Sequence, residues 1–380
     1  MQEDREACEL LFAMARPSDA EQIHRLAAKV RDWDSVLRLA DEHRVLPMLF
    51  TRLVNIGPTV PQIVQERLQA EYDTNMFHNL ANAVELIAVL KALEHEMIPA
   101  MPFKGVVLGA SIYHDLTTRP AGDLDLLIHY RHLARATTLL LERGYELKTS
   151  LHPDGTPISP SFTYEYHFER QTDGMVFELR WRLELAPPKF KRDLGMDWVW
   201  PRRRITMLAG AEVPDMSPEI TLLVLCMHGS KHAWSRLIWI CDVAQLLASF
   251  PSLDWKEVIR EAKKSGLFRA LALGVLLAYR IADATVPPEV LRRFEANTTA
   301  STLAQHIQQH LFDAPGTTPI GHIPYDFQLL DFRDRIGYLL SFDFLRPSER
   351  DRATLPLPTP LHPLYYLIRP FRIFWDRSAR

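Results

Sequence analysis

Hydrophobic positions in the first part of the chain recur at the spacing of an α-helix. Leu10, Leu11 and Met14 fall on one helical face. Pro61 suits the first turn of a helix, and the pattern after it predicts one long helix to about residue 95. We therefore expect residues 1–95 to be a helical region, which either supports the rest of the chain or takes part in substrate recognition.

From about residue 97 the apolar positions indicate β-strands. A short apolar run with two prolines at 97–103 is followed by segments in which apolar and polar positions alternate with a period of two. Asp173-Gly174 separates two such runs and predicts a hairpin. The expected strands cover residues 97–103, 122–128, 145–149, 162–168 and 175–183, with a helix at 130–143. This pattern predicts an α+β protein with an α/β-type core between helical N- and C-terminal parts.

The expected strand at 122–128 carries two carboxylates on one face. Side chains alternate along a strand, so Asp123 and Asp125 share a face and the leucines between them share the other. Their Cα atoms would lie roughly 6 to 7 Å apart. Two such anions repel each other unless a cation joins them or one binds a proton. Mg²⁺ is a hard ion that suits such a pair, usually together with substrate phosphates.

The residues before this strand predict a phosphate site. Lys104-Gly105 follows an expected strand and opens a helix-like segment at 106–113, and free N–H groups at a helix start bind anions. Lys104 and Arg119 are expected to neutralise phosphate oxygens. For Arg119 the alternative is a salt bridge beside Asp115.

Glu178 is the candidate for a third carboxylate. In the expected strand at 175–183 it falls on the polar face, and two-metal phosphoryl transfer uses one further ligand at the second ion. Glu165 on the neighbouring strand and Glu184 are its rivals. Alternatively, Glu178 is an exposed residue that pairs with Arg180 or Arg182.

Later segments are helical, basic or rich in proline. Residues 187–215 form an irregular basic connection, interpreted as a solvated face or as a triphosphate contact. Residues 217–296 are expected to be helical, and helical spacing through 228–243 puts His228 and His232 on one face. These two histidines either bind zinc, pack in the core or contact a phosphate. The proline-rich tail is expected to pack or to contact a membrane surface or nucleic acid. The basic residues of the connection are Lys189, Lys191, Arg192 and Arg202-Arg203-Arg204.

Composition narrows the functional classes. The 380 residues carry a formal net charge of −3, which argues against a general nucleic-acid binder. Cys8, Cys226 and Cys241 are too few and too scattered for a disulfide framework or a zinc ribbon. The N-terminus lacks the pattern of a signal peptide, and no apolar stretch reaches about 18 residues. We expect a cytoplasmic protein with no transmembrane segment.

Several of these motifs together resemble a known family. Lys104-Gly105, Tyr113, Arg119-Pro120 and the run at 122–127 are similar to the signature of a family of bacterial nucleotidyltransferases in the DNA polymerase beta superfamily. Residues 228–242 and 34–47 are also similar, and the likeness covers roughly residues 34–250. The superfamily pattern is a glycine turn, Asp-x-Asp and a later carboxylate. Its turn is usually Gly-Gly or Gly-Ser, which Lys104-Gly105 replaces here.

The resemblance implies a fold and a reaction. The fold is a nucleotidyltransferase-like mixed sheet, with a helical N-terminal region at 1–95, a catalytic core at 96–186, a helical nucleotide-closing domain at 187–300 and a C-terminal extension at 301–380. The reaction moves a nucleoside monophosphate from an NTP, such as ATP, to an acceptor hydroxyl of a small molecule, a peptide or RNA and releases pyrophosphate.

The resemblance also implies roles for individual residues. Two Mg²⁺ ions, or Mn²⁺, would be held by Asp123, Asp125 and Glu178. Phosphates would be bound by Lys104, Gly105, Arg119, Lys231, His232 and Arg236. Two alternatives stay open. One is an inactive module that binds a nucleotide or a partner protein. The other is a toxin-like enzyme that adds nucleotides to tRNA, which the local basic run allows and the net charge disfavours.

Overall fold

The computed structural model describes residues 2–16, 20–54, 59–148, 164–183 and 194–313. Of the C-terminal part it further describes Tyr325, Leu329, Leu364 and Tyr365. The expected C-terminal helices lie outside the described residues, as do Glu184 and the basic residues Lys189, Lys191 and Arg192.

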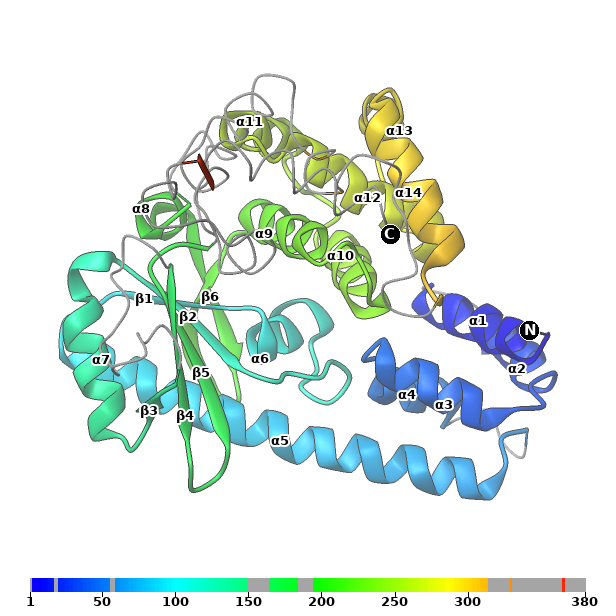
Figure 1. The fold of residues 1–380 in the computed structure, drawn as a ribbon, viewed down its shortest axis with the longest axis horizontal. Helices are drawn as coiled ribbons and strands as arrows, with labels where there is room; N and C mark the ends of the chain where they lie inside the picture. The colour runs from blue at the N-terminus through cyan, green and yellow to red at the C-terminus, as the bar shows by residue number, and fades with distance from the viewer. Residues whose placement is uncertain are drawn as a thin grey trace.

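The N-terminal region is helical, as the periodicity predicts. Its helices are α1 (Gln2–Ala15), α2 (Ala20–Ala27), α3 (Trp33–Glu42), α4 (Leu46–Leu53) and α5 (Gln62–His95). Asp32 caps α3, because its carboxylate accepts from the N–H groups of Asp34 and Ser35. Helix α5 runs along one side of the molecule, from α3 and α4 at one end to the sheet at the other (Figure 1). It therefore joins the N-terminal helices to the sheet.

Helix α5 contradicts one sequence-based expectation. It is long and apolar enough to cross a membrane, with an 18-residue window of mean hydropathy 1.2, although the sequence was expected to contain no such stretch. Core helices of water-soluble proteins pass the same test, so length and composition are weak evidence. Leu86, Val89 and Leu93 of α5 are buried in the core against the sheet, which explains part of its apolar character.

The sheet has five strands in the order β1-β2-β5-β4-β3. They are β1 (Ala100–Phe103), β2 (Leu124–Ile128), β3 (Glu146–Leu147), β4 (Glu165–Arg170) and β5 (Met175–Arg180). β2 and β5 pair in parallel, and the other pairs are antiparallel. Leu124, Leu126 and Ile128 pack in the core beneath the sheet, whereas Leu127 belongs to a second core on the other face. The predicted mixed sheet and alternation are confirmed.

Short helical elements complete this unit. They are α6 (Gly105–Leu108), a π-helical turn (Gly109–Tyr113), a 3₁₀ turn (Tyr130–His132) and α7 (Leu133–Glu142). The hairpin between β4 and β5 forms where Asp173-Gly174 predicts it, with Arg170 opposite Met175.

The basic connection is not irregular throughout. After α8 (Met196–Val199) and a 3₁₀ turn (Trp200–Arg202), β6 (Arg203–Leu208) and β7 (Ala211–Met216) form a two-stranded hairpin. Its turn holds Ala209 at φ 45° and Gly210 at φ 82°. A turn of this kind usually carries Asn-Gly or Asp-Gly, so Ala-Gly gave no recognisable signal.

The three consecutive arginines of this connection are bound within the protein. Arg204 pairs with Asp215 at 2.6 Å, Arg203 lies over the ring of Trp200, and Arg202 is 3.8 Å from Glu261. Each of these arginines thus has a partner within the protein, and the interpretation of the connection as a triphosphate contact stays a prediction.

The C-terminal half is helical. It contains α9 (Pro218–Lys231), α10 (Leu237–Ser249), α11 (Trp255–Ser265), α12 (Phe268–Ala282), α13 (Pro288–Glu295) and α14 (Thr298–His310). The helical spacing assumed through 228–243 is wrong, because Ala233 and Trp234 have positive φ and separate α9 from α10. The N-terminal helices α1–α4 share one hydrophobic core with these helices. No finding tests the four predicted domain boundaries, and they stay a prediction.

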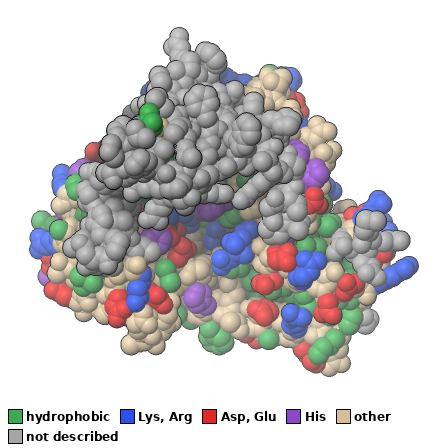
Figure 2. Space-filling view, viewed as in Figure 1, with side chains coloured by type: hydrophobic (Ala, Val, Ile, Leu, Met, Phe, Trp, Pro, Cys, Tyr) green, Lys and Arg blue, Asp and Glu red, His purple; other side chains and the backbone are tan. Residues whose placement is uncertain are grey.

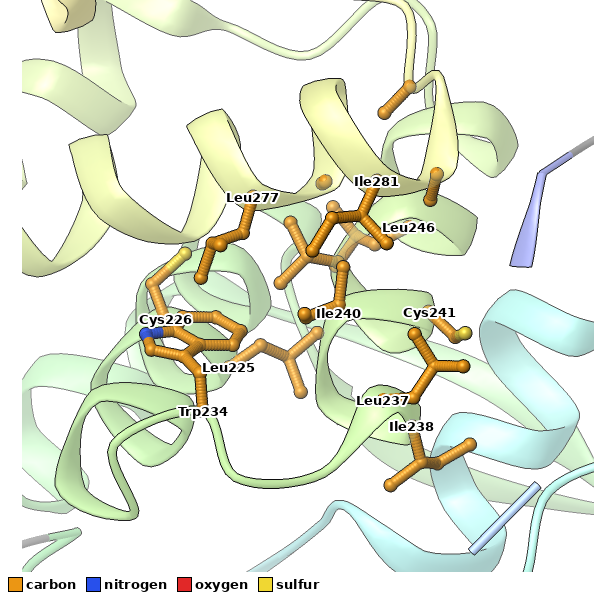
Figure 3. Close-up of a cluster of buried hydrophobic side chains, with 14 of the residues drawn as sticks. Leu225, Cys226, Trp234, Leu237, Ile238, Ile240, Cys241, Leu246, Leu277 and Ile281 are labelled. Atoms are coloured by element: carbon orange, nitrogen blue, oxygen red, sulfur yellow. The ribbon is translucent and has the colours of Figure 1, made fainter. Parts of the chain in front are cut away.

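Trp234 explains why the chain turns there. Its side chain is fully buried, and Figure 3 shows the ring beside Cys226 and Leu225. A Cβ atom on Gly229 would lie 2.6 Å from the ring, and one on Gly274 would lie 2.9 Å from it. The two glycines therefore leave the space that the indole fills.

Candidate active site

Three carboxylates meet at the end of the sheet. Asp125 on β2 lies opposite Glu178 on β5 in the parallel ladder, and Asp123 directly precedes β2. One oxygen from each of the three side chains lies within 4.8 Å of the others. We call Asp123, Asp125 and Glu178 the acidic wall. Glu165, the rival of Glu178, is not part of this group.

Two cations contact the acidic wall. The Nε atom of Arg180 lies 3.1 Å from Oδ1 of Asp125, and Nζ of Lys104 lies 3.5 Å from the same oxygen. Arg180 also pairs with Glu178, and with Glu165 at 2.8 Å. The pair between Glu178 and Arg180 that the alternative interpretation assumed thus exists, but Glu178 is not exposed, since its side chain is only 13% accessible.

Burial and charge act in opposite directions on these groups. Burial raises the pKa of Asp123 and of Glu178, and the neighbouring charge of Asp125 raises both further. Burial also opposes ionisation of Asp125, but the charges of Lys104 and Arg180 hold its pKa below the ordinary value. Asp125 is therefore the most firmly ionised of the three carboxylates.

The donor set fits a hard divalent cation. Carboxylate oxygens are the preferred protein ligands of Mg²⁺. The three carboxylates and Glu165 pair with Lys104, Arg180 and His167, and the two glutamates raise the pKa of His167. The four carboxylates thus outnumber the permanent cations that pair with them. Asp123, Asp125 and Glu178 could hold such an ion. Around His228 and His232, the described part of the chain offers no comparable group of three ligands.

The acidic wall lines a cavity of about 430 Å³ between the sheet and the helices. Acidic and basic side chains meet near the middle of the face drawn in Figure 2. Lys231, His232 and Arg236 line the cavity from the turn between α9 and α10, and Lys104, Gly105 and Arg119 line it from the sheet side. The cavity thus brings together the six residues to which the family resemblance assigns phosphate binding, whereas Arg202, Arg203 and Arg204 are not among its lining residues.

The glycine turn between β1 and α6 is strained. Lys104 has φ 59° and ψ −152°, a backbone conformation that is almost restricted to glycine. Gly105 has φ 45°, and a Cβ atom there would lie 3.2 Å from the carbonyl oxygen of Asp123. Non-glycine residues in such conformations cost about 1 to 3 kcal/mol each. The turn therefore packs closely against the acidic wall.

Arg119 is held by a residue that the sequence did not pair with it. Its Nε and NH2 atoms donate to the two carboxylate oxygens of Asp242 on α10, at 2.8 and 3.0 Å. Tyr113 donates to Asp242 as well. The alternative of a salt bridge beside Asp115 is wrong, because Asp115 accepts from Thr117 instead. The buried Arg119–Asp242 pair joins the glycine-turn side of the cavity to α10.

The helical side of the cavity carries basic and aromatic groups. Lys231 donates to the hydroxyl of Tyr164 at 2.7 Å. The ring of His232 stacks on Trp239, with centroids 5.1 Å apart and an interplanar angle of 28°. The guanidinium of Arg236 lies over the ring of Trp239, 5.6 Å from its centroid.

Sequence reasoning missed Arg44 and Trp239. Both line the cavity. Arg44 comes from the turn between α3 and α4, and it has φ 57°. The similarity of residues 34–47 to the family was the available signal, but no spacing there pointed to one side chain. We call Arg44, Lys231 and Arg236 the basic wall.

Comparison with known proteins agrees with this geometry. The sequence profile of a family described as uncharacterised nucleotidyltransferase matches residues 29–283. This span covers more than half of the chain and includes both walls of the cavity. No curated protein matches the chain.

Proposed function

Because the chain belongs to the uncharacterised nucleotidyltransferase family, which implies a nucleotide substrate, we propose that it transfers a nucleoside monophosphate from an NTP to an acceptor hydroxyl and releases pyrophosphate. One observation carries the proposal beyond the family. The three carboxylates of the acidic wall lie within 4.8 Å of one another at a cavity that also carries basic side chains.

The acidic wall would hold the catalytic metal, Mg²⁺ or Mn²⁺, at up to two positions. Bound there, the ions would lower the pKa of the attacking hydroxyl and stabilise charge on the leaving pyrophosphate. The protein contributes the positions of the ligands. β-ladder pairing fixes Asp125 beside Glu178, and Lys104 and Arg180 hold the carboxylate of Asp125 in place.

Phosphate binding falls to the other residues of the cavity. Lys104 and the backbone of Gly105 would contact phosphate oxygens from the sheet side, and Lys231, His232 and Arg236 from the helical side. Arg119 adds positive charge to the same cavity, with its orientation set by Asp242.

Nucleotide binding followed by thermal unfolding tests the proposal. Each NTP is added with and without Mg²⁺ to the wild type and to the Asp123→Asn/Asp125→Asn variant. Ligand at about 100 times its Kd should add about 2.7 kcal/mol to the free energy of unfolding. We expect a Mg²⁺-dependent rise in Tm that the variant loses.

A matched control separates the site from a general charge effect. Asp34 and Asp197 are 94% and 95% exposed, so Asp34→Asn/Asp197→Asn removes the same charge from the surface. This control should keep the full Mg²⁺-dependent shift. A wild type whose Tm no NTP changes would contradict the proposal.

One observation favours the alternative of a binding module without turnover. Arg180 and Lys104 already pair with Asp125, so the acidic wall is partly neutralised within the protein. Release of pyrophosphate distinguishes the two functions. Saturable NTP binding without pyrophosphate release, with every acceptor class tried, would favour the binding module.

A further inference from the structure

The position of Arg44 at the cavity depends on contacts between the turn that follows α3 and the start of α10. The Nδ1 atom of His43 accepts from the backbone N–H of Leu237 at 3.1 Å, and the carbonyl oxygen of His43 accepts from Ile238 at 3.3 Å. The turn between α3 and α4 is thereby fixed to the first residues of α10. The left-handed conformation of Arg44 then turns its side chain out of the helical path.

The guanidinium of Arg44 lies against the segment that precedes the acidic wall. A Cβ atom on Gly122 would be 3.5 Å from NH2 of Arg44. Gly122 and Asp123 line the cavity together with Arg44. Yet no carboxylate in the described ranges lies within ion-pair distance of Arg44, and none lies within that distance of Arg236.

The other arginines of the cavity differ in this respect. Arg119 pairs with Asp242, and Arg180 pairs with Asp125. Burial lowers the pKa of Arg44, and the charges of Arg236 and Arg119 lower it further, whereas the charges of Asp123 and Asp41 act in the opposite direction. Two like charges that line one cavity attract an anion to it.

We propose that Arg44 and Arg236 bind the terminal phosphates of the NTP, the part that leaves as pyrophosphate. This inference rests on the proposed function and names the part of the substrate that the basic wall recognises. A guanidinium donates two parallel hydrogen bonds to phosphate oxygens, and pyrophosphate carries more negative charge than one cation can neutralise. The N-terminal helical region is then part of the active site.

Isothermal titration with three probes tests this assignment in the presence of Mg²⁺. The probes are pyrophosphate, which does not depend on base preference, ATP and AMP. In Arg44→Gln we expect pyrophosphate and ATP to bind about 10- to 100-fold more weakly, because a hydrogen bond to a charged group is lost. AMP, which lacks the terminal phosphates, should bind with unchanged affinity. Arg44→Lys keeps the positive charge but lacks the two parallel N–H donors of a guanidinium, so its affinity for pyrophosphate and ATP should fall between those of the wild type and Arg44→Gln.

Two comparisons guard against an indirect effect. Arg38→Gln removes the same charge from the exposed face of α3, where Arg38 pairs with Glu42, and should bind all probes as the wild type does. The unliganded Arg44→Gln protein should unfold at a Tm close to that of the wild type, since it loses the repulsion from Arg236 and Arg119 together with the attraction to Asp123 and Asp41. Arg236→Gln provides the same test from the other side of the cavity.

The outcomes separate this inference from the proposed function. Unchanged pyrophosphate and ATP affinity in Arg44→Gln and Arg236→Gln would overturn the inference and leave nucleotidyl transfer intact. An equal loss for AMP would also overturn it. Arg44-dependent pyrophosphate binding in a protein without turnover would support it while the transfer reaction fails. A wild type that binds none of the probes would overturn both.

Discussion

The two walls of the cavity are built on different principles. The carboxylates of the acidic wall lie on or beside paired strands, and Asp125 is 5% exposed and neutralised by cations of the chain. Lys231 and Arg236 of the basic wall are exposed and flank a turn with two left-handed residues. The acidic wall is thus largely complete without a ligand, whereas the basic wall holds charges that a phosphate would neutralise.

The largest effect should come from a matched pair within the sheet. Glu178→Gln and Glu165→Gln each weaken one contact with Arg180, but only Glu178 belongs to the acidic wall. Loss of residues around metal ligands typically costs 10- to 100-fold, so loss of a ligand should cost at least about 100-fold in turnover. We expect that loss in Glu178→Gln and about 10-fold or less in Glu165→Gln.

Pyrophosphate release under Mg²⁺ saturation measures both variants. If Glu165→Gln lost as much activity as Glu178→Gln, the acidic wall would have to include Glu165.

The connection between the two walls should carry the next largest effect. Asp242→Ala leaves the buried guanidinium of Arg119 without its carboxylate, and breaking a buried pair costs about 3 to 5 kcal/mol. Urea unfolding should show this loss. Arg119→Met/Asp242→Leu, which removes both charges, should recover much of the stability. A loss below about 1 kcal/mol in Asp242→Ala would mean that the two walls are held together by other contacts.

The backbone strain at Lys104 predicts that substitution by glycine leaves the protein more stable than substitution by alanine, which is the reverse of the usual order in a helix. Lys104→Gly and Lys104→Ala lose the same ion pair, but only glycine relieves the backbone. The glycine variant should be more stable by about 1 to 2 kcal/mol. At the exposed Lys91 within α5 the order should be the usual one, with alanine more stable by about 1 kcal/mol. Equal Tm values for the two Lys104 variants would contradict the strain.

The last effect concerns the attachment of the basic wall and depends on pH. Burial, with a further contribution from the charge of Arg236, lowers the pKa of His43 from 6.5 to about 4. The unfolded chain therefore binds a proton first as the pH falls, and stability is lost between about pH 6.5 and pH 4, by about 1 kcal/mol per pH unit. His43 packs edge-on against Phe312, 4.6 Å away.

Urea unfolding at several pH values measures this slope. His43→Gln can still accept from Leu237 but does not titrate, so its stability should change less over this range. The same slope in both proteins would assign the pH dependence to other groups.

The acidic wall could be predicted from sequence because strand geometry is local. A period of two places Asp123 and Asp125 together, and the parallel neighbour of Asp125 proved to be Glu178, on the predicted polar face. The fold class followed from the same alternation, combined with helical spacing before and after it.

The basic wall could be predicted only in part, because residues other than glycine in the left-handed conformation are hard to recognise from sequence. Trp234 at φ 54° interrupts what helical spacing presents as one continuous helix. Arg44 reaches the cavity through contacts of His43 with a segment 194 residues away, which no local pattern encodes. The hairpin turn at Ala209 could not be predicted either, since alanine is not a usual residue at positive φ.

The parallel pairing of β2 with β5 also determines when the active centre can assemble during synthesis. The chain from residue 129 to 174 must close a loop before Asp125 meets Glu178, and that entropy is lost before the contact is made. The hydrogen bond between His43 and Leu237 can form only later, after residue 237 has been synthesised. A nascent chain that ends before β5 carries two of the three carboxylates and an unanchored Arg44. We therefore expect the proposed nucleotide binding to begin only after α10 has left the ribosome.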